Sequence, residues 1–211
     1  MPVLIASWFD SVREWDVAGF HLIAINLQNG FFDSLMPFIT NKWNFTAPLA
    51  LLSLYLILFR PRRDLILAIS AVAVVLLADG TTQIFKGLVQ RIRPCHVFQQ
   101  VQLLHGAVCT GSFSFPSNHA SNIFALAAFI SYNYRRLAIP SFLFAILVGY
   151  SRIYLTAHYP TDVLAGAAWG MLLGFTVAMV AGRLMRFSQA DEPPRTDSTK
   201  ESLVSHTKPS Q

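Results

Sequence analysis

Long apolar stretches separated by short polar segments make up most of this 211-residue chain. A membrane-spanning helix needs about 20 mostly apolar residues. Two stretches meet this length outright, one meets it but contains Asp79, and two shorter ones reach it with their polar flanks. These stretches lie at residues 43–59, 65–85, 120–134, 137–150 and 163–182. We therefore predict an all-α fold, a polytopic membrane helix bundle with five to six transmembrane helices and interfacial N-terminal helices.

The two ends of the chain depart from this pattern. Residues 1–45 begin with a segment whose apolar side chains share one helical face, and an Asn-Gly turn signal interrupts the next apolar stretch. We expect interfacial or re-entrant helices there, with a further span through residues 17–40 as the alternative. Residues 46–186 form the predicted transmembrane core. The polar, proline-bearing residues 187–211 are expected to be a disordered cytoplasmic tail.

The charge of the chain is low and unevenly placed. Only 13% of the residues are charged, where soluble domains carry about 25%. Basic residues at 60–64, 134–136 and 182–186 fall on one side of the predicted bilayer, which the positive-inside rule makes cytoplasmic. The net charge of +5 therefore reflects mainly the orientation of the chain in the membrane. No motif indicates a nucleic-acid partner.

The opposite face also carries positive charges, which topology does not explain. They are Lys86, Arg91, Arg93 and Arg152, and they indicate an anionic ligand. Arginine binds phosphate oxygens in a bidentate way and lysine acts as a point charge. Arg91 is assigned instead to lipid headgroups, which long basic side chains reach by snorkelling, and it is left outside the site.

A second polar cluster, "FPSNHASN", precedes the apolar run that starts at Ala120. Ser117 suits the N-cap position of a helix. The free N–H groups of such a helix, including that of Asn118, form an anion site with His119 in the first turn. Taken alone, this pattern also describes an ordinary capped helix with an exposed histidine.

The third cluster, "SRIYLTAHYPTD", contains Arg152, and places His158 four residues before Asp162. Pro160 suits the first turn of the following helix. Asp162 can then reach back to one ring nitrogen of His158 and leave the other free as a nucleophile or base. A capping aspartate beside an interfacial histidine is the alternative.

Together the clusters supply two histidines, an aspartate, three cations and a helix N-terminus. A nucleophile, an acid and charge-stabilising groups are what a phosphoryl-transfer site requires. The clusters lack the group of carboxylates that would hold magnesium. We expect metal-independent chemistry without a cofactor.

Two cysteines, Cys95 and Cys109, fall in the outward loop. A disulfide is permitted if that side is periplasmic, and it would close a loop of about 15 residues worth roughly 3 kcal/mol. The alternatives are two free thiols, or a zinc site with His96 and His105, whose spacing fits no zinc pattern.

The motifs "KGLVQRIRP", "PSNH" and "SRIYLTAHYPTD", in that order, resemble those of the type 2 phosphatidic acid phosphatase superfamily, which shares its site with vanadium haloperoxidases and bacterial acid phosphatases. One departure is Asn118, where the family has glycine. The resemblance implies that His158 attacks phosphorus to form a phosphohistidine, that Asp162 orients it, and that His119 protonates the leaving oxygen and then activates water. The phosphoryl oxygens would be held by Lys86, Arg93, Ser117, the Asn118 backbone and Arg152.

The resemblance further implies a bacterial inner-membrane enzyme whose site faces the periplasm or cell exterior. Its substrate would be a lipid phosphate in the bilayer, with undecaprenyl pyrophosphate as first choice, and no obligate protein partner is expected. Lipid A, phosphatidylglycerophosphate and phosphatidate are the alternative substrates. Two rival functions are a non-catalytic lipid-binding protein and a vanadate-dependent haloperoxidase.

Overall fold

The computed structural model describes residues 2–41, 43–44, 51, 54–55, 58–59, 61–98, 111 and 113–190, with side chains from residue 11 to residue 185. Within these residues every named element is a helix, so the all-α prediction is confirmed. The elements are α1 (Pro2–His21), a π-helical turn (Leu22–Asn26), α2 (Gly30–Thr40), α4 (Arg62–Val89), α5 (Pro94–Val97), α7 (Asn118–Asn133), a 3-10 turn (Arg135–Leu137), α8 (Ala138–Tyr154) and α9 (Pro160–Ala190).

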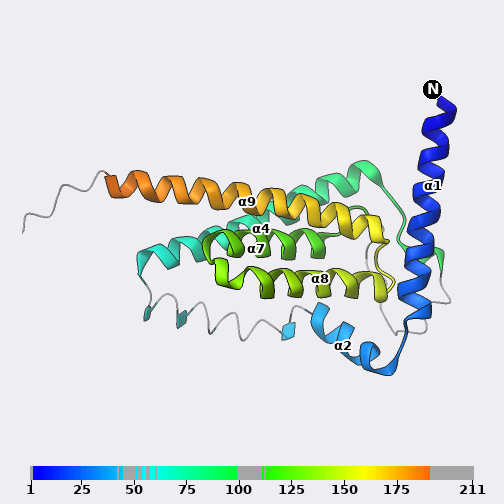
Figure 1. The fold of residues 1–211 in the computed structure, drawn as a ribbon, viewed down its shortest axis with the longest axis horizontal. Helices are drawn as coiled ribbons and strands as arrows, with labels where there is room; N and C mark the ends of the chain where they lie inside the picture. Colours follow the sequence, from blue (N-terminus) through cyan, green and yellow to red (C-terminus); the bar gives the residue numbers. More distant parts are fainter. Residues whose placement is uncertain are drawn as a thin grey trace, which may run out of the picture.

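Helices α4, α7, α8 and α9 form the bundle, with α7 in contact with the other three (Figure 1). Three described helical segments are long and apolar enough to cross a membrane, at Arg63–Val89, Arg135–Tyr154 and Pro160–Met185. Helix α7 has 16 residues. It is buried along one side through residues such as Phe124 and Phe129. Most of the expected first span, at residues 43–59, lies outside the described residues.

Three glycines let α9 approach α7 closely. Gly166, Gly170 and Gly174 recur every fourth residue, which places them on one face of the helix. A Cβ atom at Gly166 would lie 2.5 Å from the carbonyl oxygen of Ser117, and the other two would overlap carbonyl oxygens further along α7. The small residues therefore bring the start of α9 against the start of α7.

The two ends of the bundle differ, and one of them, called the polar end here, holds the three polar clusters. The last turn of α4, the first turn of α7, the last turn of α8 and the first turn of α9 lie at the same end, to the right in Figure 1. The opposite end holds the short connection between α7 and α8, where Tyr134 donates to the buried carboxylate of Asp64 at 3.0 Å. The three polar clusters thus share one end, as the alternating topology requires.

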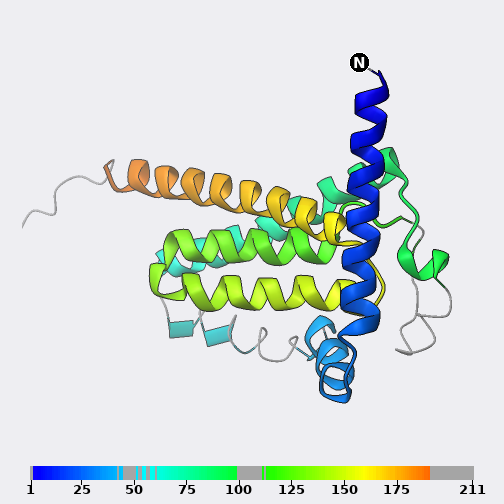
Figure 2. The same cartoon turned by 45° about the vertical axis from the view of Figure 1, so that its right-hand side comes forward.

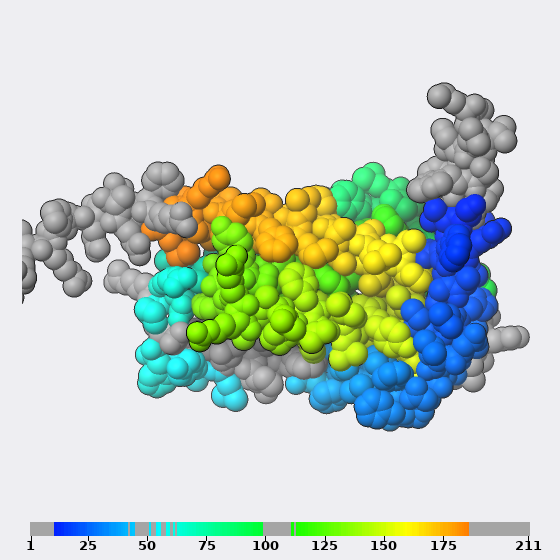
Figure 3. Space-filling model, viewed as in Figure 1, coloured from blue at the N-terminus to red at the C-terminus, as the bar shows by residue number. Residues whose placement is uncertain are grey.

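The N-terminal helices cover this polar end. Helix α1 crosses the ends of α8 and α9, and α2 packs beside α8 (Figures 2 and 3). The fully buried ring of Phe20 anchors α1, with its centroid 5.4 Å from that of Phe98 and 5.7 Å from that of Tyr159. Tyr154 of α8 donates to Asp33 of α2 at 2.6 Å. An interfacial position for these helices stays a prediction.

The C-terminal helix is longer than expected. Helix α9 continues to Ala190, four residues beyond the predicted end of the core at residue 186. The rest of the predicted tail, residues 191–211, lies outside the described residues.

Candidate active site

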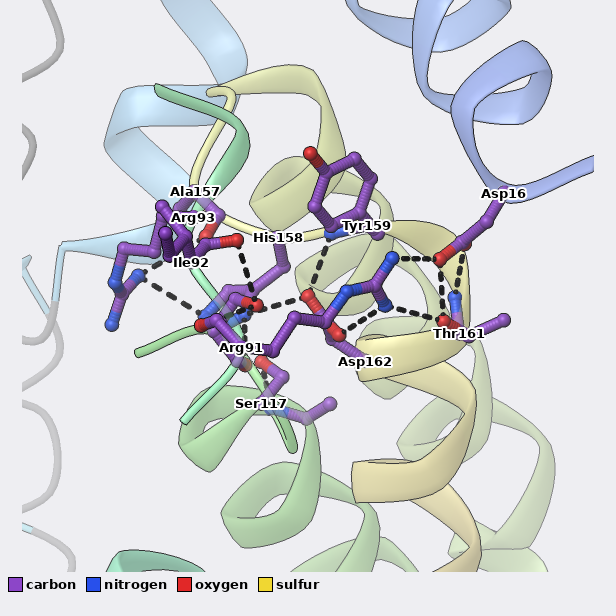
Figure 4. Close-up of polar contacts among 12 residues, drawn as sticks. Asp16, Arg91, Ile92, Arg93, Ser117, Ala157, His158, Tyr159, Thr161 and Asp162 are labelled. Atoms are coloured by element: carbon purple, nitrogen blue, oxygen red, sulfur yellow. Dashed lines mark hydrogen bonds and ion pairs between the residues drawn. The ribbon is translucent and has the colours of Figure 1, made fainter. Parts of the chain in front are cut away.

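The first cluster lies where α4 ends and the chain turns. Lys86 is in the last turn of α4, and Gln90 ends the helix in a left-handed conformation with φ of 52°. Arg93 then precedes Pro94, the first residue of α5. Its Nη1 donates to the carbonyl oxygen of Ala157 at 3.1 Å and lies 3.4 Å from Nε2 of His158 (Figure 4). Arg93 and the third cluster therefore meet directly.

The second cluster begins α7 as predicted. Ser117 is the N-cap residue, and its buried hydroxyl accepts a hydrogen bond from the backbone N–H of Ala120 at 3.4 Å. The backbone N–H of Ser117 donates to the carbonyl oxygen of Asp162 at 3.0 Å, which ties α7 to α9. Asn118 and His119 occupy the first turn, and the His119 side chain is exposed.

His158 lies in the loop before α9 and is 1% exposed. Its Nδ1 lies 2.8 Å from the carbonyl oxygen of Ser114 and 3.7 Å from Oδ2 of Asp162. Since a carbonyl oxygen only accepts, this contact makes Nδ1 the protonated nitrogen and leaves Nε2 unprotonated, so that Nε2 accepts from Nη1 of Arg93. Burial lowers the pKa of His158 to about 4, and the nearby negative charge of Asp162, which acts in the opposite direction, does not outweigh burial.

Asp162 is fully buried and accepts hydrogen bonds from two other groups. Its Oδ2 accepts from the backbone N–H of Tyr159 at 2.9 Å, and its Oδ1 accepts from Nη1 of Arg91 at 2.8 Å. At 3.7 Å the carboxylate is beyond hydrogen-bond distance of His158. In this structure the Ser114 carbonyl, rather than Asp162, fixes the ring, a role that sequence reasoning missed because a backbone group has no residue signature.

The remaining cations lie close to the same point. The positive charges of Arg93 and Arg152 are close enough to act on the Lys86 side chain. The charges of Lys86, Arg93 and Arg152 all act on His119. Arg152 donates from Nη1 to the hydroxyl of Thr40 in α2 at 2.6 Å. The Nε atoms of Arg93 and Arg152 are buried and have no hydrogen-bond partner among the described residues. Buried donors nearly always have partners, so these two are available to an anion.

With this geometry in view, comparison with known proteins gives a clear result. Residues 65–186, more than half of the chain, match the PAP2 superfamily. The chain belongs to the PAP2 superfamily. This confirms the resemblance on which the site residues were predicted.

Individual PAP2 relatives agree with this membership. The lipid A 4'-phosphatase of Bacteroides thetaiotaomicron is 32% identical, covering 79% of this chain and 77% of the relative. The undecaprenyl-diphosphatase BcrC of Bacillus subtilis is 36% identical over 29% of this chain and 32% of its own length.

Two solved PAP2 structures have the same fold. The structure of Aquifex aeolicus LpxE superposes with a TM-score of 0.59 at 26% identity, covering 76% of this chain and 92% of that one. The transmembrane phosphatidylglycerolphosphate phosphatase of Bacillus subtilis gives a TM-score of 0.56 at 25% identity, with 88% and 90% covered. The present chain is therefore a membrane-embedded phosphatase of the PAP2 superfamily.

Arg91 corrects the sequence interpretation of this PAP2 site. It was assigned to lipid headgroups, but its guanidinium donates to Asp162 and lies 4.0 Å from the centre of the Tyr159 ring. The sequence offered no sign of this, because Asp162 is 71 residues away. Arg91 is part of the site's support.

Asn118 replaces the glycine of the PAP2 pattern, and its side chain turns toward α4. Its Nδ2 donates to Oδ1 of Asp79 at 2.9 Å, and Asn122 donates to the same oxygen at 3.2 Å. Asp79, the one acid in the predicted second span, thereby acquires two partners. The Asn118 side chain is held by Asp79, and its backbone N–H remains in the first turn of α7.

Cys95 is buried and disulfide-bonded. Its expected partner, Cys109, lies outside the described residues, so the pairing between the two stays a prediction. The backbone N–H of Cys95 donates to the carbonyl oxygen of Thr156 at 3.1 Å. This contact holds α5 against the loop that carries His158.

Proposed function

We propose that this protein hydrolyses the phosphate group of a membrane lipid through a phosphohistidine at His158, without a metal ion. The observation that carries the proposal is the state of that side chain. His158 is buried and neutral, its Nδ1 proton is donated to Ser114, and its Nε2 lies 3.4 Å from a guanidinium nitrogen of Arg93. An unprotonated imidazole nitrogen whose lone pair faces a phosphate-binding cation can act as a nucleophile toward a phosphorus atom bound by that cation.

In the first step, Nε2 of His158 attacks phosphorus and the bond from phosphorus to the leaving oxygen breaks, while His119 gives a proton to that oxygen. In the second step, His119 takes a proton from water as the water oxygen attacks phosphorus, the bond from phosphorus to Nε2 of His158 breaks, and phosphate leaves. The phosphoryl charge would be balanced by Lys86, Arg93 and Arg152, with hydrogen bonds from Ser117 and the Asn118 backbone. The two unpartnered Nε donors support this assignment.

Asp162 acts in this scheme mainly through its charge. The imidazole becomes positive when it bonds to phosphorus, and a buried carboxylate 3.7 Å away favours that state. Hydrogen bonds of a catalytic site are often long before the substrate binds and tighten afterwards.

We place the site on the outward face of a bacterial inner membrane. The basic residues Arg135, Arg136 and Arg183 belong to the opposite end of the bundle. The positive-inside rule makes their end cytoplasmic, which supports a site that opens toward the periplasm or cell exterior.

For the substrate, we propose a lipid A phosphate first and undecaprenyl pyrophosphate second. The lipid A 4'-phosphatase match extends over 79% of the chain, whereas the undecaprenyl-diphosphatase match extends over 29%. This difference in coverage reverses the order of substrates that the sequence interpretation prefers. The higher local identity of the undecaprenyl-diphosphatase match, 36% against 32%, keeps undecaprenyl pyrophosphate in the comparison.

The test measures phosphate release by the purified protein from lipid A, undecaprenyl pyrophosphate, phosphatidylglycerophosphate and phosphatidate. We expect turnover with and without EDTA, and none in the His158→Ala variant. A folded His158→Ala protein that keeps substantial activity would rule out the nucleophile. A strict metal requirement would rule out the mechanism, and a wild-type protein inactive on all four lipids would favour a binding function.

A further inference from the structure

A carboxylate from the N-terminal helix reaches into the active-site support. Asp16 lies on α1 and is 2% exposed. Its Oδ2 accepts hydrogen bonds from Nη2 of Arg91 at 2.5 Å and from the Thr161 hydroxyl at 2.6 Å. Its Oδ1 accepts from the backbone N–H of Thr161 at 2.8 Å (Figure 4). Asp16 belongs to none of the three PAP2 motifs.

Arg91 connects this carboxylate to Asp162. One guanidinium nitrogen binds Asp16, and the other donates to Oδ1 of Asp162 and to the Thr161 hydroxyl, each at 2.8 Å. The face of the guanidinium lies over Tyr159, whose backbone N–H is the other donor to Asp162. The orientation of Asp162 therefore depends on where Arg91 is held.

Asp16 is bound firmly enough to hold it. Thr161 is in the first turn of α9, where backbone N–H groups lack partners within the helix. Asp16 supplies one from outside, as an N-cap side chain would. A buried carboxylate is costly unless it is paired and hydrogen-bonded, and Asp16 has three donors.

Two carboxylates thus share one cation. Burial acts to lower the pKa of Arg91, but the charges of Asp162 and Asp16 outweigh burial and raise that pKa, so Arg91 stays charged. If Asp16 loses its charge, the guanidinium keeps Asp162 as its only ionic partner among the described residues. The Thr161 hydroxyl and the Tyr159 ring then remain its other contacts, and the ionic attraction that balances Asp162 is lost.

We propose that Asp16 is a positioning residue for the phosphatase reaction, which acts through Arg91 to set the orientation of Asp162 beside His158. Helix α1 is then part of the catalytic scaffold as well as a cover for the bundle end. Asp16 does not touch the phosphate. This inference rests on the proposed function of His158 and Asp162.

The test compares Asp16→Asn with a matched control, Glu14→Gln, in the full-length protein. Both changes remove one carboxylate charge from α1, but Glu14 is exposed. The substrate is whichever of the four lipids the wild-type protein hydrolyses fastest, and inorganic phosphate serves as the competitive inhibitor. We expect Asp16→Asn to lower kcat by about 10- to 100-fold, as small displacements of catalytic groups do. KM and the inhibition constant of phosphate should change less than about twofold, and Glu14→Gln should match the wild type.

Two further variants test the route. If Asp16 acts through Arg91, adding Asp16→Asn to Arg91→Gln should cause no further loss of kcat. Asp16→Glu keeps the charge and should recover part of kcat. Wild-type kcat in Asp16→Asn, a loss confined to phosphate affinity, or full additivity with Arg91→Gln would overturn the proposal. So would an Asp16→Asn protein that does not fold, because the residue would then be structural. A wild-type protein that releases no phosphate would instead refute the proposed function.

Discussion

Replacing Gly170 by alanine tests how closely α7 and α9 must approach. A Cβ atom there would overlap the carbonyl oxygen of Ser121 and lie 2.9 Å from the backbone nitrogen of Ala125. Both neighbours are backbone atoms of α7, which cannot rotate away as a side chain can. Because carbon atoms pack at about 3.5–4 Å, the two helices must separate by roughly 1 Å.

The size of the effect follows from this geometry. Overpacking costs about 1–3 kcal/mol, and contact with backbone on the opposite helix favours the upper end. Alanine also stabilises a helix by about 0.5–1 kcal/mol relative to glycine. The net result for Gly170→Ala is a loss of about 2 kcal/mol in the free energy of unfolding.

Gly182 provides the control on the same helix. No described atom lies within 4 Å of a Cβ atom built there. Gly182→Ala should therefore gain about 0.5–1 kcal/mol from helix propensity alone. The two variants should differ by about 3 kcal/mol, or roughly 6–12 °C in Tm for a chain of this size.

The assay is thermal unfolding of the purified variants in one detergent. Gly170→Ala should melt below the wild type and Gly182→Ala at or above it. A Gly170→Ala protein that melts no lower than Gly182→Ala would show that the backbones of α7 and α9 are far enough apart to accommodate a Cβ atom at residue 170. The start of α7 carries Ser117 and His119, so separation of the helices should also lower kcat.

Two further predictions concern the site itself. In histidine side-chain NMR, with His158→Ala to assign the signal, His158 should titrate near pH 4 because burial lowers its pKa. The pKa of histidine in the unfolded chain is about 6.5, so between about pH 6.5 and 4 the unfolded chain binds more protons than the folded one. The free energy of unfolding should therefore fall as pH drops through this range. A His158 titration midpoint near pH 6.5 would contradict the burial argument. Asp79→Ala should lower kcat by about tenfold or more. A hydrogen bond to a charged group is worth about 1.5–3 kcal/mol, and without it the Asn118 side chain is free to enter the proposed phosphate site. Adding Asn118→Gly, the residue of the family pattern, should restore kcat, and a double variant as slow as Asp79→Ala would refute that explanation.

Much of the architecture could be predicted from local patterns. Apolar stretches predicted helices, and Ser117 and Pro160 begin α7 and α9 as their capping preferences indicate. The spacing of Gly166, Gly170 and Gly174, four residues apart, is typical of a close helix contact, which the structure contains. The order and spacing of the three motifs predicted the PAP2 superfamily, which comparison confirmed. These signals are readable because each depends on residues within a few positions of one another.

What only the tertiary structure decided is how the site is held together. The Ser114 carbonyl lies on Nδ1 of His158, 44 residues away, and a carbonyl group is the same in every residue type. Arg91 reaches Asp162 across 71 residues, and Asp16 reaches Thr161 across 145. A sequence shows that such charges exist, but not which ones meet, because helix periodicity describes only the face of a single helix. Their pairing depends on how α1, α4 and α9 pack. Because of that packing, Arg91 binds Asp162 rather than lipid headgroups, and Asp16, which no sequence motif contains, binds Arg91.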